Sequence, residues 1–520
     1  MPSLEQFRQM TGGQGADSSQ NWKPPVALRE RLIVGALLLQ FLWLAICMGG
    51  VNLWAQHTSV AIAVVTFLLL AIPLPGEAEN PLSRQPRAVL LRLLKFPPFW
   101  LGFGLITYVW IQSWNVEWAY TFVPPGTGRM IRQDYIEWLP SGIIAPLEQS
   151  NPYRGMLYLM VPWLSICCLW AGVQSRRALN FLLQAVAVIF VVWGIAALYQ
   201  HYTGMNQILG IWDTHPRKAN SSVPFWGTLV NENHGAFFLV LGTGLCQALF
   251  LGGLARAARE FRFGGWYLLH FGFALMLSFA AAQAESRGAT GMVVVLWFGF
   301  LVICSYFFVR FYALKGALFP IGILSVFLLF AFISVANPDR YERLKRSYER
   351  TVSLSDNPEL EGRYYMLKVT NAMISDRPWL GYGAGSFRYL HLRYAGPYAE
   401  LAPTYRVRVV DSETGRRVWR SQPFWFRQAH LDLSEFVIEL GIIGCSFIVL
   451  AWLWALGVFL RYWRYVDYGQ IALLWAGFVL ILGAAWEFHF RAPLLPFTWT
   501  LLMILAVKIV WLRVPARESR

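Results

Sequence analysis

The chain has 520 residues, of which 56% are hydrophobic and only 14% are charged. Soluble domains carry about 25% charged residues, so the composition excludes an ordinary soluble protein and indicates an integral membrane protein. The formal net charge is +15, and orientation in the bilayer accounts for much of this basic excess without a nucleic acid partner.

Residues 1–25 are polar and contain Gly and Ser, which predicts a disordered N-terminal segment. The first apolar run begins too far into the chain, and is too long, to be a signal peptide. A membrane-spanning helix needs about 20 mostly apolar residues, and by this criterion we predict an all-α integral membrane protein with about twelve spans. They lie near residues 32–51, 59–75, 97–113, 155–174, 179–199, 234–254, 266–284, 289–309, 316–336, 432–459, 470–486 and 493–512.

The spans divide the chain into segments with different roles. We predict a disordered N-terminal segment at residues 1–25, spans one to nine at 26–336 and a large loop at 337–430. Spans ten to twelve follow at 431–512, and a tail ends the chain at 513–520. Lys and Arg concentrate in alternate connections, and the connection at residues 52–58, which belongs to the other set, has none. The positive-inside rule therefore predicts two cytoplasmic termini and an extracytoplasmic large loop.

This sidedness restricts the chemistry, because the outer face of a cell membrane has no supply of ATP or nucleotide sugar. Any group-transfer donor used there has to be lipid-linked or already exported. The sequence contains no GxxxxGK[ST] phosphate loop, no HExxH motif and no Asp-x-Asp motif. The six cysteines all lie in apolar runs, as is typical of small core residues. We therefore predict no metal site and no cofactor.

The large loop contains its own predicted elements. Asn357 and Pro358 suit the cap and first position of a helix, which should end at Arg377 because the next residue is a proline. A glycine-rich turn follows at residues 379–386. Residues 404–419 alternate with a period of two around a central turn, which predicts a β-hairpin.

Polar residues also gather at the predicted outer ends of the spans. Arg217 and Lys218 precede the sixth span, where cations oppose the charge rule. The start of that span carries Asn231, Asn233 and His234. Either asparagine could simply cap the helix, and Arg287, at the end of the seventh span, could simply extend to the headgroups. Alternatively, Arg217 and Arg287 converge on a phosphate, because a guanidinium stays charged and binds two oxygens at once.

His430 opens the tenth span, and three acids follow it on one helical face: Asp432, Glu435 and Glu439. Acids on a membrane helix are costly unless they face a wet cavity or basic partners. The large loop offers three such partners: Arg363, Arg388 and Arg393. A further outer cluster near the end of the eleventh span is either functional or an interfacial anchor: Glu487, His489 and Arg491.

The order of these landmarks resembles the O-antigen ligase and polysaccharide polymerase superfamily of bacterial inner membranes. The matching pieces are residues 227–234, 286–288, 362–387 and 430–444, so the landmarks cover roughly 215–445 and the span layout extends the likeness. The hairpin at 404–419 and the acidic Glu232 depart from the family pattern, and both bear on the identity of the acceptor.

The resemblance implies a metal-independent, inverting glycosyltransferase with its site on the periplasmic face. Such enzymes move a glycan from an undecaprenyl-diphosphate carrier to a hydroxyl of lipid A core, another glycan or a protein. Arg217 and Arg287 would stabilise the leaving diphosphate, and His430 would orient or deprotonate the attacking hydroxyl. Binding of donor or acceptor would fall to Lys218, Asn231, Asn233, His234, Arg363, Arg388, Asp432, Glu435 and Glu439.

Other functions stay open from the sequence. One is a flippase for lipid-linked glycans or another polysaccharide transporter, and further ones are a protein O-oligosaccharyltransferase of the same superfamily and a non-catalytic scaffold. Transporters tend to place charge at the bilayer midplane in repeated halves. Here the polar residues gather at one face and no repeat is detected, although His270 and the region of Glu439 could reverse this interpretation.

Overall fold

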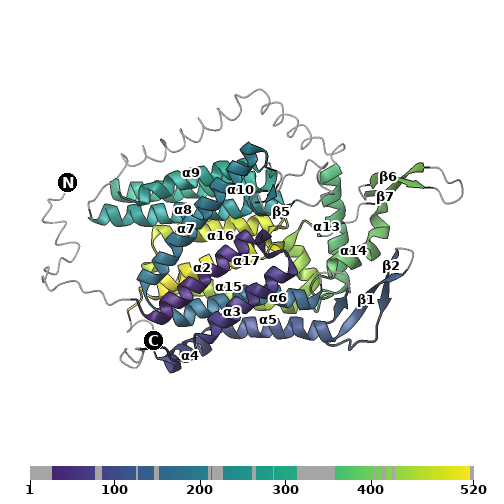
Figure 1. Ribbon diagram of the computed structural model, residues 1–520, viewed down its shortest axis with the longest axis horizontal. Helices are drawn as coiled ribbons and strands as arrows, with labels where there is room; N and C mark the ends of the chain where they lie inside the picture. The colour runs from purple at the N-terminus through teal and green to yellow at the C-terminus, as the bar shows by residue number, and fades with distance from the viewer. Residues whose placement is uncertain are drawn as a thin grey trace.

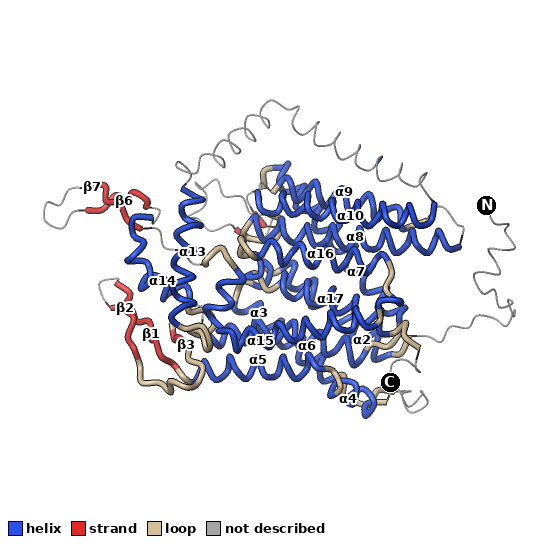
Figure 2. The backbone as a smooth tube through the Cα atoms, turned by 180° about the vertical axis from the view of Figure 1, so that it is seen from behind, coloured by secondary structure: helices blue, strands red, loops and turns tan. Residues whose placement is uncertain are grey.

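The computed structural model describes residues 26–75, 85–123, 127–145, 151–205, 207–208, 212–213, 226–260, 265–284, 286–312, 322, 358–401, 404–410, 417–423, 426 and 428–515. This part of the chain is a bundle of long apolar helices with small sheets gathered at one end (Figure 1). The same division into a helical body and a mixed cap is visible from behind (Figure 2).

Helices make up most of the described chain. The N-terminal half contains α2 (Leu28–Ile46), α3 (Leu53–Leu68), α4 (Pro86–Leu94), α5 (Pro97–Trp114), α6 (Pro152–Gly172), α7 (Arg176–Thr203), α8 (Glu232–Glu260), α9 (Tyr267–Gln283) and α10 (Arg287–Tyr312). The C-terminal half contains α13 (Pro358–Asp376), α14 (Phe387–Ala395), α15 (Asp432–Arg461), α16 (Tyr468–Ala484) and α17 (Leu494–Trp511). Short 3₁₀ helices are η1 (Met48–Gly50), η5 (Gly396–Leu401), η6 (Trp463–Tyr465) and η7 (His489–Arg491).

The composition of these helices supports a multi-pass membrane protein. Among the described residues, six helices are long and apolar enough to cross a membrane (α6, α7, α8, α10, α15 and α17), or seven if the bent pair α4–α5 is one span. Helices α3, α9 and α16 are apolar but shorter. The predicted span at 316–336 lies outside the described residues, apart from residue 322. The count of twelve spans therefore stays a prediction.

Helix α8 lies at the centre of one half of the bundle, between α9, α10 and α16. Nearly all of its side chains are buried, as expected for a helix that is apolar all round. Its close approach to α16 depends on small residues, because a Cβ atom on Gly244 would lie 2.2 Å from that of Ala476. Small residues at such crossings let membrane helices pack through van der Waals contact.

Basic side chains close the helices at one end of the bundle. They donate to backbone carbonyls at helix C-termini: Arg29 to Leu69, Leu70 and Ile72, Arg92 to Ala171, Lys508 to Trp170, and Arg176 to Leu512. Cations are favoured there by the helix dipole. Helix α2 begins and α17 ends at this basic end, and its cytoplasmic orientation stays a prediction.

The opposite end carries all the strands of the described chain (Figure 1). Strands β1 (Val116–Val123), β2 (Thr127–Arg132) and β3 (Gly142–Ile144) form a sheet of order β2-β1-β3, antiparallel between β1 and β2 and parallel between β1 and β3. The strands β4 (Gln207–Ile208) and β5 (Trp212–Asp213) pair antiparallel. Strands β6 (Thr404–Val410) and β7 (Arg417–Pro423) confirm the predicted hairpin. The β1–β3 sheet was not predicted.

The glycine-rich turn after α13 packs directly against α15. Helix α13 begins at Pro358 and ends before Arg377 as predicted, whereas its expected cap, Asn357, lies outside the described residues. Gly381 has φ +68°, and a Cβ atom on it would lie 2.6 Å from the backbone nitrogen of Gly441. Gly441 itself has φ +65° and interrupts α15. The backbone N–H of Tyr382 can therefore donate across this gap to Ile438 at 2.8 Å.

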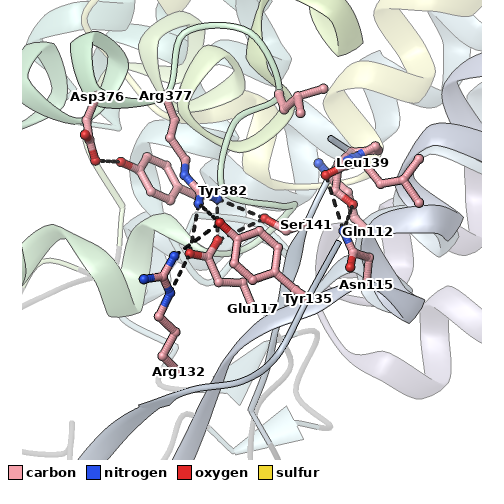
Figure 3. Close-up of polar contacts among 12 residues, drawn as sticks. Gln112, Asn115, Glu117, Arg132, Tyr135, Leu139, Ser141, Asp376, Arg377 and Tyr382 are labelled. Carbon is pink, nitrogen blue, oxygen red and sulfur yellow. Dashed lines mark hydrogen bonds and ion pairs between the residues drawn. The ribbon is translucent and has the colours of Figure 1, made fainter. Parts of the chain in front are cut away.

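A polar network joins the β1–β3 sheet to α13 (Figure 3). Arg377, just after α13, donates to Glu117 Oε1 at 2.9 Å and to the Tyr135 hydroxyl at 2.7 Å. Ser141 donates to Glu117 Oε2 at 3.1 Å, and Arg132 lies 3.4 Å from Glu117 Oε1. These contacts hold two segments that are far apart in sequence in one cap.

Candidate functional site

Residues 487–491 lie between α16 and α17, and we call them the 487–491 link. Helices α6, α8, α13 and α15 all make polar contacts with it. The segment is apolar or neutral at Phe488, His489 and Phe490 and charged at its two ends, Glu487 and Arg491. Most of the described candidate residues converge on this link.

Arg491 lies among the three acids of α15. Its guanidinium is 3.0 Å from Glu435 Oε1, 3.0 Å from Glu439 Oε2 and 3.7 Å from Asp432 Oδ1. All three carboxylates are buried, so the prediction that they share one face is confirmed. Burial opposes the charge of Arg491, but the carboxylates hold the pKa of its guanidinium above the usual value.

The partner predicted for these acids was wrong. The sequence suggested the loop arginines, but Arg363 pairs with Glu487 at 2.8 Å, and Arg393 lies over the Trp118 ring at 4.2 Å. The 487–491 link instead turns back over the start of α15, where the Phe490 N–H donates to Asp432 Oδ2 at 2.8 Å. That turn places Arg491 above the acids.

Glu487 is where α10 and α13 meet the link. It is 2% exposed and accepts the hydrogen bond from Arg363, whose side chain is 35% exposed. A Cβ atom on Gly288 would lie 2.9 Å from Glu487 Oε1, so the first turn of α10 touches the same carboxylate. Arg287 is the exposed first residue of α10. The structure thus places Arg363 of α13 and the first turn of α10, which begins with Arg287, beside one acidic side chain.

The N-terminus of α10 is itself suited to an anion. Ser286 caps it, accepting from the N–H of Ala289 at 3.4 Å. The unused backbone N–H groups and the helix dipole make such a terminus favourable for negative charge. Arg287 adds a full positive charge at the same place.

Two histidines flank Phe488 of the link. The ring centroid of His430 lies 4.2 Å from that of Phe488, and the ring of His234 lies 5.1 Å from it. His234 Nε2 is 3.1 Å from the Phe488 carbonyl oxygen. His430 is half-buried and has φ +55°, a conformation that is uncommon for a residue other than glycine and clusters at functional sites.

The side chain of His489 is fully buried among core residues. Its ring stacks on Phe237 with centroids 4.0 Å apart, and its Nε2 is 3.1 Å from the Leu480 carbonyl oxygen. Burial lowers the pKa of His489 to about 3, so the side chain is neutral at physiological pH. Within the predicted outer cluster, Glu487 and Arg491 belong to the site, whereas His489 packs in the core.

The remaining candidates have other contacts or lie outside the described residues. The Asn231 side chain accepts from the Asn233 N–H at 2.8 Å, which agrees with the capping alternative for α8. Arg388 lies on α14 with its guanidinium 6.0 Å from the Tyr389 ring centroid. Arg217 and Lys218 lie outside the described residues.

Sequence reasoning missed Tyr158 and undervalued the two charged ends of the link. The Tyr158 hydroxyl donates to the Phe490 carbonyl from α6, and nothing in the sequence distinguishes it from other span tyrosines. Glu487 and Arg491 had a usable signal, because charged residues are costly so close to a membrane helix. Within the described chain, no group of three or more His, Cys, Asp or Glu side chains is arranged to hold a metal ion.

The comparison with protein families bears on the same region. Residues 271–449 match the family model described as O-antigen ligase. The matched range contains Arg287, Arg363, His430 and the three acids of α15, and it ends before the 487–491 link. No curated protein matches the chain.

Proposed function

We propose that the chain, whose residues 271–449 match the O-antigen ligase family model, is a glycosyl-transferring membrane enzyme of that superfamily, and from this premise we propose the reaction it catalyses. It moves a glycan from an undecaprenyl-diphosphate carrier to an acceptor hydroxyl at the periplasmic face of the bacterial inner membrane. The reaction is of the O-antigen ligase or polysaccharide polymerase type, with lipid A core, another glycan or a protein as acceptor. It needs no metal and inverts the anomeric carbon.

The observation that carries this proposal is that Arg363 and the first turn of α10, which begins with Arg287, meet at Glu487. Two guanidiniums and a helix N-terminus form a site for a diphosphate, because guanidinium binds two oxygens at once and stays charged. As the bond between the sugar C1 and the diphosphate oxygen breaks, negative charge grows on the leaving group. Arg287, with Arg363 and Arg217, stabilises that charge in the role that a metal plays elsewhere.

His430 is the proposed general base. It takes the proton of the acceptor hydroxyl while the hydroxyl oxygen attacks C1 from the side opposite the diphosphate, which inverts the configuration. The products are the glycosylated acceptor and undecaprenyl diphosphate. The contact of His430 with Phe488 and the pairing of Glu487 with Arg363 support a common site, because both residues belong to the 487–491 link.

A transporter is the main alternative. Its best sequence signal was His270, whose Nε2 is 2.7 Å from Gln184 Oε1 on the neighbouring α7. This bond gives His270 a structural role between two helices. Among the described residues, ion pairs between different helices lie at the two ends of the bundle. This placement favours a reaction at the membrane surface over transport through the bundle.

The test is a transfer assay with purified protein, a synthetic undecaprenyl-diphosphate glycan and a panel of acceptors, with EDTA present. We expect release of undecaprenyl diphosphate together with a glycosylated product. Arg287→Ala and His430→Ala should each lower the rate by about 10²-fold or more. The matched controls are Arg461→Ala, at the other end of α15, and His57→Ala, an exposed histidine on α3, and both should keep the activity.

The assay tests each part of the proposed mechanism separately. Normal transfer by the Arg287→Ala protein would remove the diphosphate role, and normal transfer by His430→Ala would remove the general base. If glycan crossed sealed vesicles with no bond formed or broken, the transporter would replace the transferase.

A further inference from the structure

An open pocket of ≈ 500 Å³ lies between α2 and α7 at the basic end of the bundle, away from the 487–491 link. Its volume falls in the range of small-ligand sites, which is about 300–1,000 Å³. The walls include Val34, Gly35 and Phe181, and two arginines, Arg31 and Arg177, also line it. The pocket is thus apolar on its walls and basic at its rim.

Both arginines are exposed, and among the described residues neither has a carboxylate partner. Arg31 donates through its Nε to the Val26 carbonyl at 2.9 Å. Glu30 also lines the pocket, but it is 3% exposed and its Oε1 accepts from the Gln174 N–H at 3.0 Å. The charge presented outward is therefore positive.

The apolar walls continue along the helices as an exposed face. On α2 this face follows helical spacing from the pocket toward the other end: Leu32, Gly35, Leu39, Leu42 and Ile46. On α7 it follows the same direction: Phe181, Val188, Val192 and Ile195. A Cβ atom on Gly35 would meet no atom within 4 Å, so the face has an open notch at the pocket.

We propose that this pocket binds an anionic phospholipid. Its phosphate lies on Arg31 and Arg177, and an acyl chain enters the notch at Gly35 and follows the apolar face of α2 and α7. The arginines fit a phosphate because each guanidinium presents a fork of donors. Basic pockets between membrane helices next to the headgroups are suited to anionic lipids. The apolar face selects a lipid over free phosphate, since inorganic phosphate would leave that face uncovered.

The proposal does not depend on the proposed function, because the pocket lies at the other end of the bundle. Its test is binding of phosphatidylglycerol to the full-length protein in detergent, followed by native mass spectrometry or by a titration of the melting temperature. Arg31→Ala and Arg177→Ala should each weaken binding about fivefold. Gly35→Leu should weaken it as well, because the new side chain fills the notch while both charges remain.

The matched control is Arg461→Ala, which removes an exposed arginine at the same end of the bundle but outside the pocket. It should bind phosphatidylglycerol like the unchanged protein, and phosphatidylcholine should bind weakly to all of them. Equal phosphatidylglycerol binding by all the proteins would overturn the proposal. So would full protection by inorganic phosphate alone, which would show an anion site without a lipid.

Discussion

The guanidinium of Arg491 lies among three buried carboxylates, those of Asp432, Glu435 and Glu439. A buried ion cluster adds little net stability, because desolvation offsets the attraction. Removing the single cation is different, since it leaves several charges without compensation in a region of low dielectric. The fold of the link and the start of α15 therefore depend on this side chain.

Arg491→Ala should destabilise the protein by about 3–5 kcal/mol, the cost of breaking a buried pair from one side. The measurement is thermal unfolding in detergent, with Arg461→Ala as the exposed control. Arg491→Lys should recover only part of the loss, because an ammonium group cannot bind two carboxylates as a planar fork does. An unchanged melting temperature in the alanine variant would show that the acids are neutralised by other means.

Two buried histidines make stability depend on pH. Burial lowers the pKa of His391, on α14, to about 4 and that of His489 to about 3. In the unfolded chain a histidine has a pKa near 6.5, so below that pH the unfolded state binds more protons and the free energy of unfolding falls as the pH falls. Each histidine contributes a slope of up to about 1.4 kcal/mol per pH unit.

As the pH falls from 7 to 5, we expect the stability of the His391→Gln variant to rise relative to that of the unchanged protein, because the variant lacks the destabilising contribution of His391. Asp376 does not contribute in this window. Hydrogen bonds from Tyr382 and Tyr394 lower the pKa of its carboxyl, so it titrates at more acidic pH. Identical pH profiles for the variant and the unchanged protein would contradict the role of His391.

At the scale of elements, the glycine-rich turn fixes α13 and α14 against α15. Gly381 and Gly441 both have positive φ and approach each other through backbone atoms. Neither position has room for a side chain. The turn therefore packs tightly against α15, and this packing explains its glycines.

Gly381→Ala should lower the melting temperature strongly. The left-handed conformation alone costs about 1–3 kcal/mol for a residue with a side chain, and the new Cβ would lie 2.6 Å from the Gly441 nitrogen. Gly396→Ala is the matched control, because a Cβ there meets nothing within 4 Å. Equal melting temperatures for the two variants would contradict the packing described.

Elements with a local signal could be predicted from the sequence, and those that depend on distant pairing could not. Pro358 and Pro378 delimit α13, and the alternating pattern predicts β6 and β7, because these signals lie within the elements themselves. Strand β3 has three residues, and its pairing with β1 depends on the tertiary fold. Arg491 was missed as the partner of the acids for the same reason, since it lies 52 residues from Glu439 in the chain.

At the scale of the whole molecule, the two ends of the bundle differ in chemistry. At one end, basic side chains donate hydrogen bonds to the carbonyls at helix C-termini. At the other end, ion pairs stabilise the cap and the 487–491 link. The charge pattern along the sequence predicted that these ends are distinct. Arg29, one of the basic residues that carry this pattern, is a buried helix cap, so the orientation in the membrane needs a direct test.

We expect Trp138→Cys to react with a membrane-impermeant maleimide from the periplasmic side and Arg464→Cys to react only from the cytoplasmic side. Trp138 is 77% exposed in the cap, and Arg464 is exposed near the basic end. Five native cysteines are buried and Cys445 is only partly accessible, which keeps the background low. The reverse labelling pattern would invert the predicted topology.

The pairing of Glu487 with Arg363 has a consequence for selectivity among anions. In the proposed function, the resting site already contains its own counter-anion, held at 2.8 Å and largely out of water. A chloride or a single phosphate gains little by displacing a carboxylate that is covalently tethered in place. A diphosphate brings more charge and more oxygens than Glu487 offers, so it can compete where simple salts cannot. On this proposal, Glu487 pairs with Arg363 again when the lipid product departs, and the site returns to its resting state in which the two charges offset each other.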